Sequence, residues 1–168
     1  FMVDTGSTYS IMPECLLNKI IALINQYCNA NPTKCANVHN FRLTQDSCLT
    51  LEQPDPYYKS IREAVASFPD IVLKFPNSEK PLILKPNSYF AVEDKAQRAC
   101  FALSTEPTAR KITWGAINMI DNIVYFDRVN QRLVIAPENC TVLYTEINKN
   151  RRRRLQQTEQ PIVQSSGE

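Results

Sequence analysis

The residues best suited to chemistry lie at the start of the chain, in the run Asp4-Thr5-Gly6-Ser7. In a tight turn, the Gly6 N–H and the Ser7 hydroxyl can donate hydrogen bonds to the Asp4 carboxylate, which favours its ionised form. Glycine also permits a positive φ and a close approach to another chain. Two carboxylates about 3 Å apart share one proton and together activate a water. Asp4 therefore needs a partner carboxylate to catalyse hydrolysis.

The same Asp-Thr-Gly tripeptide has a simpler interpretation. Asp-x-Gly is a common turn, because Asp accepts bonds from its own backbone and Gly supplies a positive φ. The tripeptide alone therefore does not establish a catalytic site. The neighbouring residues are needed to distinguish a catalytic turn from a structural one.

The elements that must position this turn begin with a helix. Residues 13–28 carry apolar side chains at helical spacing, and the sequence predicts that this helix packs beneath the turn. The predicted buried face comprises Leu16, Leu17, Ile20, Ile21, Ile24 and Tyr27. Pro13 suits the first helical turn, where its missing N–H would have no partner. A second, shorter helical pattern covers residues 56–68.

After residue 70 the apolar period becomes that of strands, interrupted by turn residues. The predicted strands cover residues 71–75, 82–84, 88–92, 99–103, 111–114, 122–127 and 132–136. Residues 29–56 are rich in Asn and Pro and predict an irregular insertion, with the single His39 exposed to solvent. Several short strands after the helix predict an all-β lobe with one or two short helices.

Length and composition are those of an ordinary globular domain. The chain has 168 residues, a net charge of +2 and 43% hydrophobic residues. This balance does not call for nucleic acid, and the longest apolar run falls short of the roughly 20 residues that span a bilayer. The first residue stands inside an expected strand, so we interpret the chain as a fragment.

Six cysteines favour an oxidising compartment, with metal binding as the competing interpretation. No Cys-x-x-Cys pair exists and His39 is not spaced as a ligand, so we predict neither a zinc site nor any other metal or cofactor. Cys28 and Cys35 could close a small local loop. Asn139-Cys140-Thr141 is a glycosylation sequon, which fits a secretory route.

The last part of the chain differs in composition. Arg151 to Arg154 form a basic run, followed by Gln, Ser, Thr and Glu residues with few apolar side chains. We expect residues 141–168 to form a basic, disordered tail. A membrane-proximal contact, an acidic partner or a processing site are functional alternatives for the basic run.

Several segments together resemble the C-terminal lobe of the pepsin-like aspartic proteases. The run Asp4-Thr5-Gly6-Ser7-Thr8 with Ile11-Met12-Pro13 resembles the catalytic loop of that lobe, and Ile112-Thr113-Trp114-Gly115 resembles its hydrophobic-hydrophobic-Gly element. Residues 68–73 and 84–89 resemble the middle strands, and 124–137 the closing hairpin. The resemblance covers residues 1–140 in the order of the family. Gly6 and Gly115 stand where the family brings backbone close to the active centre.

The resemblance implies a role for each matching residue. Asp4 is the second catalytic carboxylate of an aspartic endopeptidase, supported by Thr5, Gly6 and Ser7. Thr8, Tyr9, Ile117 and Met119 are candidates to bind a peptide substrate, although packing in the strand core is an equal alternative for the last two. The resemblance also implies a disulfide between Cys48 and Cys100, and a partner for Cys140 upstream of this chain.

Three hypotheses for function remain open at this point. The chain is half of a two-lobed protease that needs a missing N-terminal lobe, a catalytically dead relative that serves as a peptide-binding or inhibitor module, or a homodimeric protease with two copies of Asp4. Within the family, the insertion and the cysteines resemble plasmepsin V and beta-secretase. The implied partners are a peptide or protein substrate and the missing lobe, and the implied location is the secretory pathway.

Overall fold

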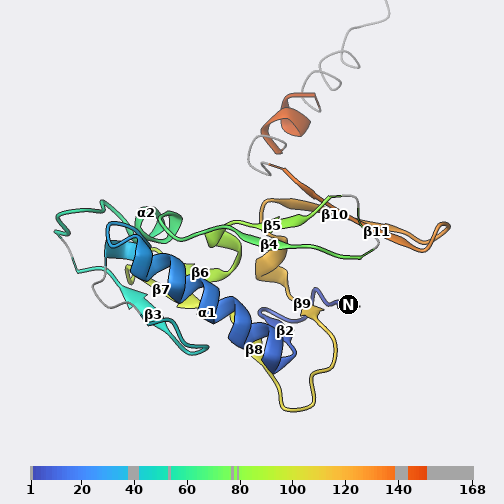
Figure 1. Ribbon diagram of the computed structural model, residues 1–168. Coiled ribbons are helices and arrows are strands. Elements are labelled where there is room, and N and C mark those ends of the chain that lie inside the picture. The colour runs from blue at the N-terminus through green and yellow to red at the C-terminus, as the bar shows by residue number, and fades with distance from the viewer. Residues whose placement is uncertain are drawn as a thin grey trace, which may run out of the picture. The chain divides into compact units, whose positions relative to one another are not determined.

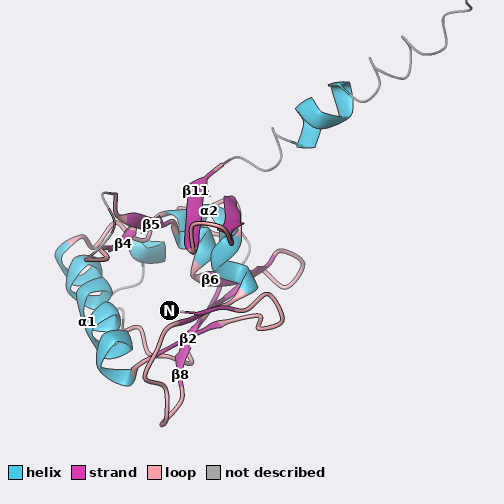
Figure 2. Ribbon diagram, turned by 90° about the vertical axis from the view of Figure 1, so that its right-hand side faces the viewer, coloured by secondary structure: helices cyan, strands magenta, loops and turns pink. Residues whose placement is uncertain are grey.

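The computed structural model describes residues 2–37, 42–52, 54–76, 78, 80–138 and 144–150. The chain falls into two compact units, Phe1–Ile120 and Asp121–Glu168, which are described separately. Short strands predominate, with one long helix and few short ones (Figures 1 and 2). The prediction of an all-β lobe with few helices is confirmed.

The sheet that carries the Asp4 turn has four strands in the order β1-β9-β2-β8. These strands are β1 (Met2–Val3), β9 (Thr113–Trp114), β2 (Ser10–Met12) and β8 (Leu103–Thr105). β9 is parallel to β1 and antiparallel to β2, and β2 is parallel to β8. Because β9 lies between β1 and β2, one strand borders both ends of the turn that joins them.

The long helix α1 (Glu14–Ala30) follows β2 directly and contacts β8 (Figure 1). Pro13 precedes the helix, and its carbonyl accepts the N–H groups of Leu16 and Leu17. The fully buried residues of α1 are Leu17, Ile20, Ile24 and Cys28. The prediction that Tyr27 belongs to this face is wrong, since Tyr27 is 37% exposed. The last buried residue of this face is instead Cys28, one residue further along the helix.

A second sheet has the order β3-β7-β6 and is antiparallel throughout. It consists of β3 (Cys48–Thr50), β7 (Arg98–Phe101) and β6 (Phe90–Glu93). The strand β3 lies in the stretch predicted to be irregular, and this prediction is wrong for these three residues. Because β3 forms by pairing with a strand 50 residues away, its local sequence carries little strand signal.

The core of the first unit lies around the aromatic side chains next to this sheet. Phe90 packs against Phe68 with ring centroids 4.8 Å apart, and against Phe101 at 5.8 Å. Tyr89 is fully buried, and burial raises the pKa of its hydroxyl. The hydroxyl of Tyr89 donates to the Pro69 carbonyl, so the buried ring is also satisfied at its polar end.

Two further strands and one short helix complete the first unit. β4 (Ile71–Leu73) pairs antiparallel with β5 (Leu82–Leu84). The helix α2 (Ile61–Ala66) is shorter than the predicted helix over residues 56–68. Asp55 explains the late start, because its carboxylate accepts the N–H groups of residues 57 and 58 at 2.8 Å each and holds that segment in a turn.

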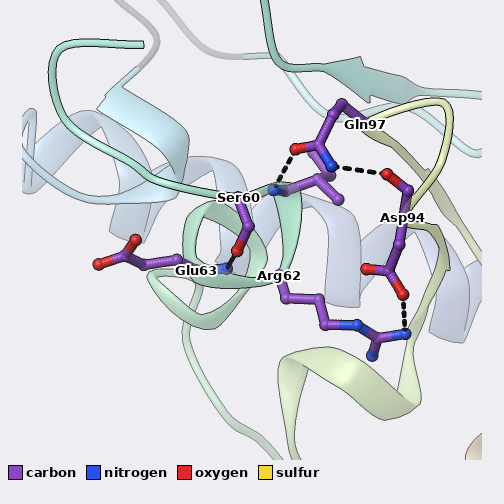
Figure 3. Close-up of polar contacts among 6 residues, drawn as sticks. Ser60, Arg62, Glu63, Asp94 and Gln97 are labelled. Carbon is purple, nitrogen blue, oxygen red and sulfur yellow. Dashed lines mark hydrogen bonds and ion pairs between the residues drawn. The ribbon is translucent and has the colours of Figure 1, made fainter. Parts of the chain in front are cut away.

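The start of α2 is tied to the turn between β6 and β7 (Figure 3). The Ser60 hydroxyl accepts the Glu63 N–H, and the Gln97 side-chain carbonyl accepts the first N–H of α2 at 3.0 Å. Gln97 also donates to the Asp94 carbonyl at 2.6 Å, and Arg62 pairs with the Asp94 carboxylate at 2.7 Å. The N–H groups of Ile61 and Glu63 at this helix end therefore have side-chain acceptors within the chain.

Two disulfides hold the first unit. Cys48 and Cys100 are directly opposite on β3 and β7 and form a disulfide, the pairing that the resemblance implies. Cys28 and Cys35 form the second, which closes the small loop after α1. Cys15 is exposed and unpaired. His39 and the sequon with Cys140 lie outside the described residues.

The second unit contains the antiparallel hairpin of β10 (Asn122–Asp127) and β11 (Arg132–Pro137). Both strands match the predicted ranges within one residue. In the turn, the Asp127 carboxylate accepts two bonds from Asn130, at 3.0 and 2.7 Å, and these bonds lower the pKa of Asp127. Residues 144–150 are helical, in a stretch where the sequence predicts no regular structure, and the rest of the predicted tail lies outside the described residues.

Candidate active site

The Asp4 carboxylate lies at the end of β1 with one hydrogen-bond donor on each oxygen. The Gly6 N–H donates to Oδ1 at 2.9 Å, and the Ser7 hydroxyl donates to Oδ2 at 2.8 Å. The Ser7 hydroxyl and then the Gly6 N–H lower the pKa of Asp4, because both bonds favour the charged carboxylate. The turn therefore holds an ionised carboxylate in one orientation.

Gly6 serves this carboxylate in a different way from the one the sequence suggests. No described glycine has a positive φ, so Gly6 does not use the positive φ that glycine permits. A Cβ at Gly6 would lie 3.2 Å from Asp4 Oδ1, which is tighter than ordinary packing. Glycine therefore lets the carboxylate fold back onto the backbone N–H of the same turn.

The segment after β9 is bonded to both sides of the Asp4 turn. The Asp4 N–H donates to the Trp114 carbonyl at 3.0 Å, on the side of β1. On the other side, the Ala116 N–H donates to the Ser7 carbonyl at 2.8 Å, and the Ile117 N–H donates to the carbonyl of Thr8 at 3.1 Å. Residues 114–117 thus fix the position of the turn within the sheet.

The side chains of Thr5, Thr8 and Tyr9 are exposed around the carboxylate, and Tyr9 is 44% exposed. A second chain or a ligand could reach all three. Their predicted roles in support and substrate binding stay predictions.

Ile117 and Met119 lie in the 3-10 helix Ala116–Met119 and not in a strand. Ile117 is buried and Met119 is half-buried. Ile117 therefore packs in the core, but in a 3-10 helix and not in a strand, while the predicted contact of both residues with substrate stays a prediction.

Three buried polar residues next to the turn were not predicted from the sequence. Ser10, Ser88 and Asn118 are 0%, 2% and 0% exposed and are joined by hydrogen bonds. No motif marks them, since they are far apart in sequence. The one local hint is a serine between Tyr9 and Ile11 in an otherwise apolar strand pattern.

Neither a metal nor a membrane span is indicated in the described part of the chain. Over the described ranges, no group of three His, Cys, Asp or Glu side chains is placed to hold a metal ion. Within the same ranges, no helix has the length and apolar character needed to cross a bilayer.

The strand order around the Asp4 turn and the supported carboxylate define the class of protein as a pepsin-like lobe. The profile of a family described as xylanase inhibitor C-terminal matches residues 1–137. The chain belongs to this family, which lies in the pepsin-like clan of aspartic proteases. A search of curated proteins found no match.

Proposed function

We propose that this chain is the C-terminal lobe of a two-lobed aspartic endopeptidase, in which Asp4 is one of two catalytic carboxylates. One observation carries the proposal: both oxygens of Asp4 have a donor, at 2.9 and 2.8 Å, on a turn whose outer side chains are exposed. The exposed side chains around the carboxylate leave access for a substrate and for a second lobe. A missing N-terminal lobe supplies the second Asp.

In this mechanism, the two carboxylates share one proton and hold a water between them. The oxygen of the water bonds to the peptide carbonyl carbon while one carboxylate takes a proton from this water. The other carboxyl group donates its proton to the carbonyl oxygen. The tetrahedral intermediate collapses when a proton passes to the leaving nitrogen and the C–N bond breaks. Gly6 and Ser7 keep the Asp4 carboxylate in the orientation that this exchange requires.

The exposed residues around Asp4 have roles in the same proposal. The Thr5 hydroxyl bonds the backbone of the opposite lobe, and Thr8 and Tyr9 line the cleft. Met119 and Ile117 form apolar walls of the cleft. The 44% exposure of Tyr9 supports a contact with substrate. Ile117 is buried, so only a small part of its side chain could contact a substrate.

The cysteines and the resemblance support a location of the whole protein in the secretory pathway. The two disulfides are typical of proteins in an oxidising compartment. Plasmepsin V and beta-secretase are the members of the clan that the chain resembles in its insertion and cysteines.

A second function is suggested only by the description of the matching family, xylanase inhibitor C-terminal. Members of this type are often catalytically inactive. In that case the cleft next to Asp4 would serve as a binding surface, and the upstream lobe would lack its Asp.

The experiment that separates the two functions uses the full-length protein with its upstream lobe. We expect the wild-type protein to cleave a denatured protein substrate at acidic pH, and Asp4→Asn to abolish cleavage while the protein stays folded. A peptide with a hydroxyl group at the scissile position should inhibit, since it mimics the tetrahedral intermediate. Absent cleavage by the wild-type protein, together with inhibition of an added xylanase, would establish the inhibitor function instead.

A further inference from the structure

The three buried polar residues beside the Asp4 turn form a continuous bridge, which we call the buried bridge: Ser10, Asn118 and Ser88. The Gly115 N–H donates to the Ser10 hydroxyl at 2.8 Å. The Ser10 hydroxyl donates to the side-chain carbonyl of Asn118, whose amide group donates to the Ser88 carbonyl. Every polar atom along this path has a partner.

The buried bridge joins three separate segments. Ser10 opens β2, the strand that leaves the Asp4 turn, and Asn118 belongs to the 3-10 helix that follows Gly115. Ser88 ends the 3-10 helix Pro86–Ser88, where its N–H and hydroxyl both bond the Lys85 carbonyl, at 2.9 and 2.8 Å. Ser88 is thus held in place by Lys85. Asn118 bonds both Ser88 and Ser10 and so fixes Ser10 relative to Ser88.

The location of the bridge connects it to the Asp4 carboxylate. The segment on which Asn118 lies also bonds the turn directly, through the Ala116 N–H to Ser7 and the Ile117 N–H to Thr8. Ser7 is the residue whose hydroxyl holds Asp4 Oδ2. A shift of Asn118 would therefore move Ser7 and loosen the bond to Asp4.

Stability alone does not account for polar groups at this place. Buried polar groups are costly when a partner is lost, and replacing both partners by apolar groups of similar shape can be nearly neutral. Ser10 and Asn118 have no exposure at all, beside the fully buried Trp114 and Met12. A fully satisfied polar network selects one geometry where apolar packing would allow several.

We propose that Asn118 and Ser10 are positioning residues that hold the Asp4 carboxylate in its working orientation by anchoring the Gly115 segment to Ser88. This inference rests on the proposed function, because it assigns the bridge to the same catalytic turn. Neither residue touches the carboxylate, so each acts through the segment from Gly115 to Ile117.

The chain offers a matched control for this proposal. Asn25 on α1 makes the same kind of two-point contact, since its amide group donates to the Leu43 carbonyl at 3.0 Å and its carbonyl accepts the Leu43 N–H at 2.6 Å. This contact anchors the insertion to the helix and includes no residue of the Asp4 turn. Asn25 and Asn118 therefore have equivalent chemistry in different places.

The test uses Asn118→Asp and Asn25→Asp in the full-length protein. A protonated carboxyl at 118 keeps the acceptor for Ser10 and a donor for Ser88, whereas the ionised form would face the Ser88 carbonyl oxygen without a donor. The bonded partners, Ser10 and Ser88, carry no titratable group. Burial raises the pKa of the introduced carboxyl, so its neutral form persists above about pH 4.

We expect kcat of Asn118→Asp, relative to wild type, to be near unity at about pH 4 and to fall about tenfold to a hundredfold as the pH rises. KM should change little, because no substrate contact is lost. The kcat ratio of Asn25→Asp should stay flat over the same range. Circular dichroism at each pH measures the folded fraction, and equal kcat profiles for both variants at equal folded fraction would overturn the proposal.

A second measurement tests the inference and does not depend on protease activity. The pKa of Asp4, followed by carboxyl-carbon NMR in the full-length protein, should rise in Ser10→Ala, because the bond from Ser7 is loosened, and should stay unchanged in Asn25→Asp. An unchanged Asp4 pKa in Ser10→Ala would overturn the inference. A wild-type protein that cleaves nothing would reject the proposed function alone, and the NMR result would still stand for the bridge.

Discussion

The backbone of Gly115 lies directly against the carbonyl group of Tyr9. A Cβ at Gly115 would be 2.3 Å from the Tyr9 oxygen, 2.4 Å from its carbonyl carbon and 2.9 Å from the oxygen of Thr8. The φ of Gly115 is −85°, which any residue can adopt. The close approach of two backbones, and not the conformation of Gly115, therefore requires glycine.

Gly115→Ala should destabilise the protein strongly. The added Cβ meets backbone atoms, which cannot rotate away as a side chain would. We expect a loss of about 3 kcal/mol in the free energy of unfolding, measured by urea denaturation of the full-length protein. A loss below about 0.5 kcal/mol would mean that the two segments separate at little cost.

Unlike Gly115→Ala, Gly6→Ala should have little effect on stability and a large effect on activity. The added Cβ would lie 3.2 Å from Asp4 Oδ1, so the side chain of Asp4 can give way. We expect a stability change below about 1 kcal/mol and a loss of about a hundredfold in kcat, because the carboxylate is displaced. Comparable kcat for Gly6→Ala and wild type would contradict this role.

Ser7→Ala should raise the pKa of Asp4 toward its ordinary value. The Ser7 hydroxyl is the largest cause of the lowered pKa, through its bond to Oδ2 at 2.8 Å. A lowered carboxyl pKa stabilises the folded state above the ordinary Asp pKa, and this contribution is lost as the pH falls through the lowered value. NMR titration of Asp4 checks the shift, and Ser7→Thr, which keeps the hydroxyl, should leave the pKa low.

The two disulfides should differ in their effect on stability. The disulfide between Cys48 and Cys100 spans 52 residues, and that between Cys28 and Cys35 spans 7. The entropy of the closed loops predicts losses of about 4 and about 2 kcal/mol when each pair is replaced by alanine. Urea denaturation of the two double variants tests this order, and a larger loss from the shorter loop would contradict it.

Local patterns in the sequence predicted the elements that depend on local spacing. The helix predicted over residues 13–28 is Glu14–Ala30, and the hairpin predicted over 122–136 is β10 and β11. The strand β3 was missed, because it depends on its pairing with β7. No element was predicted for residues 116–119, which form a 3-10 helix; the N–H groups of Ala116 and Ile117 bond the Asp4 turn there.

The sequence by itself determined the Asp4 turn, its nearest donors and the helix that follows, since these depend on neighbours within a few residues. Only the tertiary structure decided that Gly6 has an ordinary φ and that Ser10, Asn118 and Ser88 form one bridge. Ser10 and Asn118 are 108 residues apart. Contacts over such separations come from strand order and packing, which the spacing of residues along a chain does not encode.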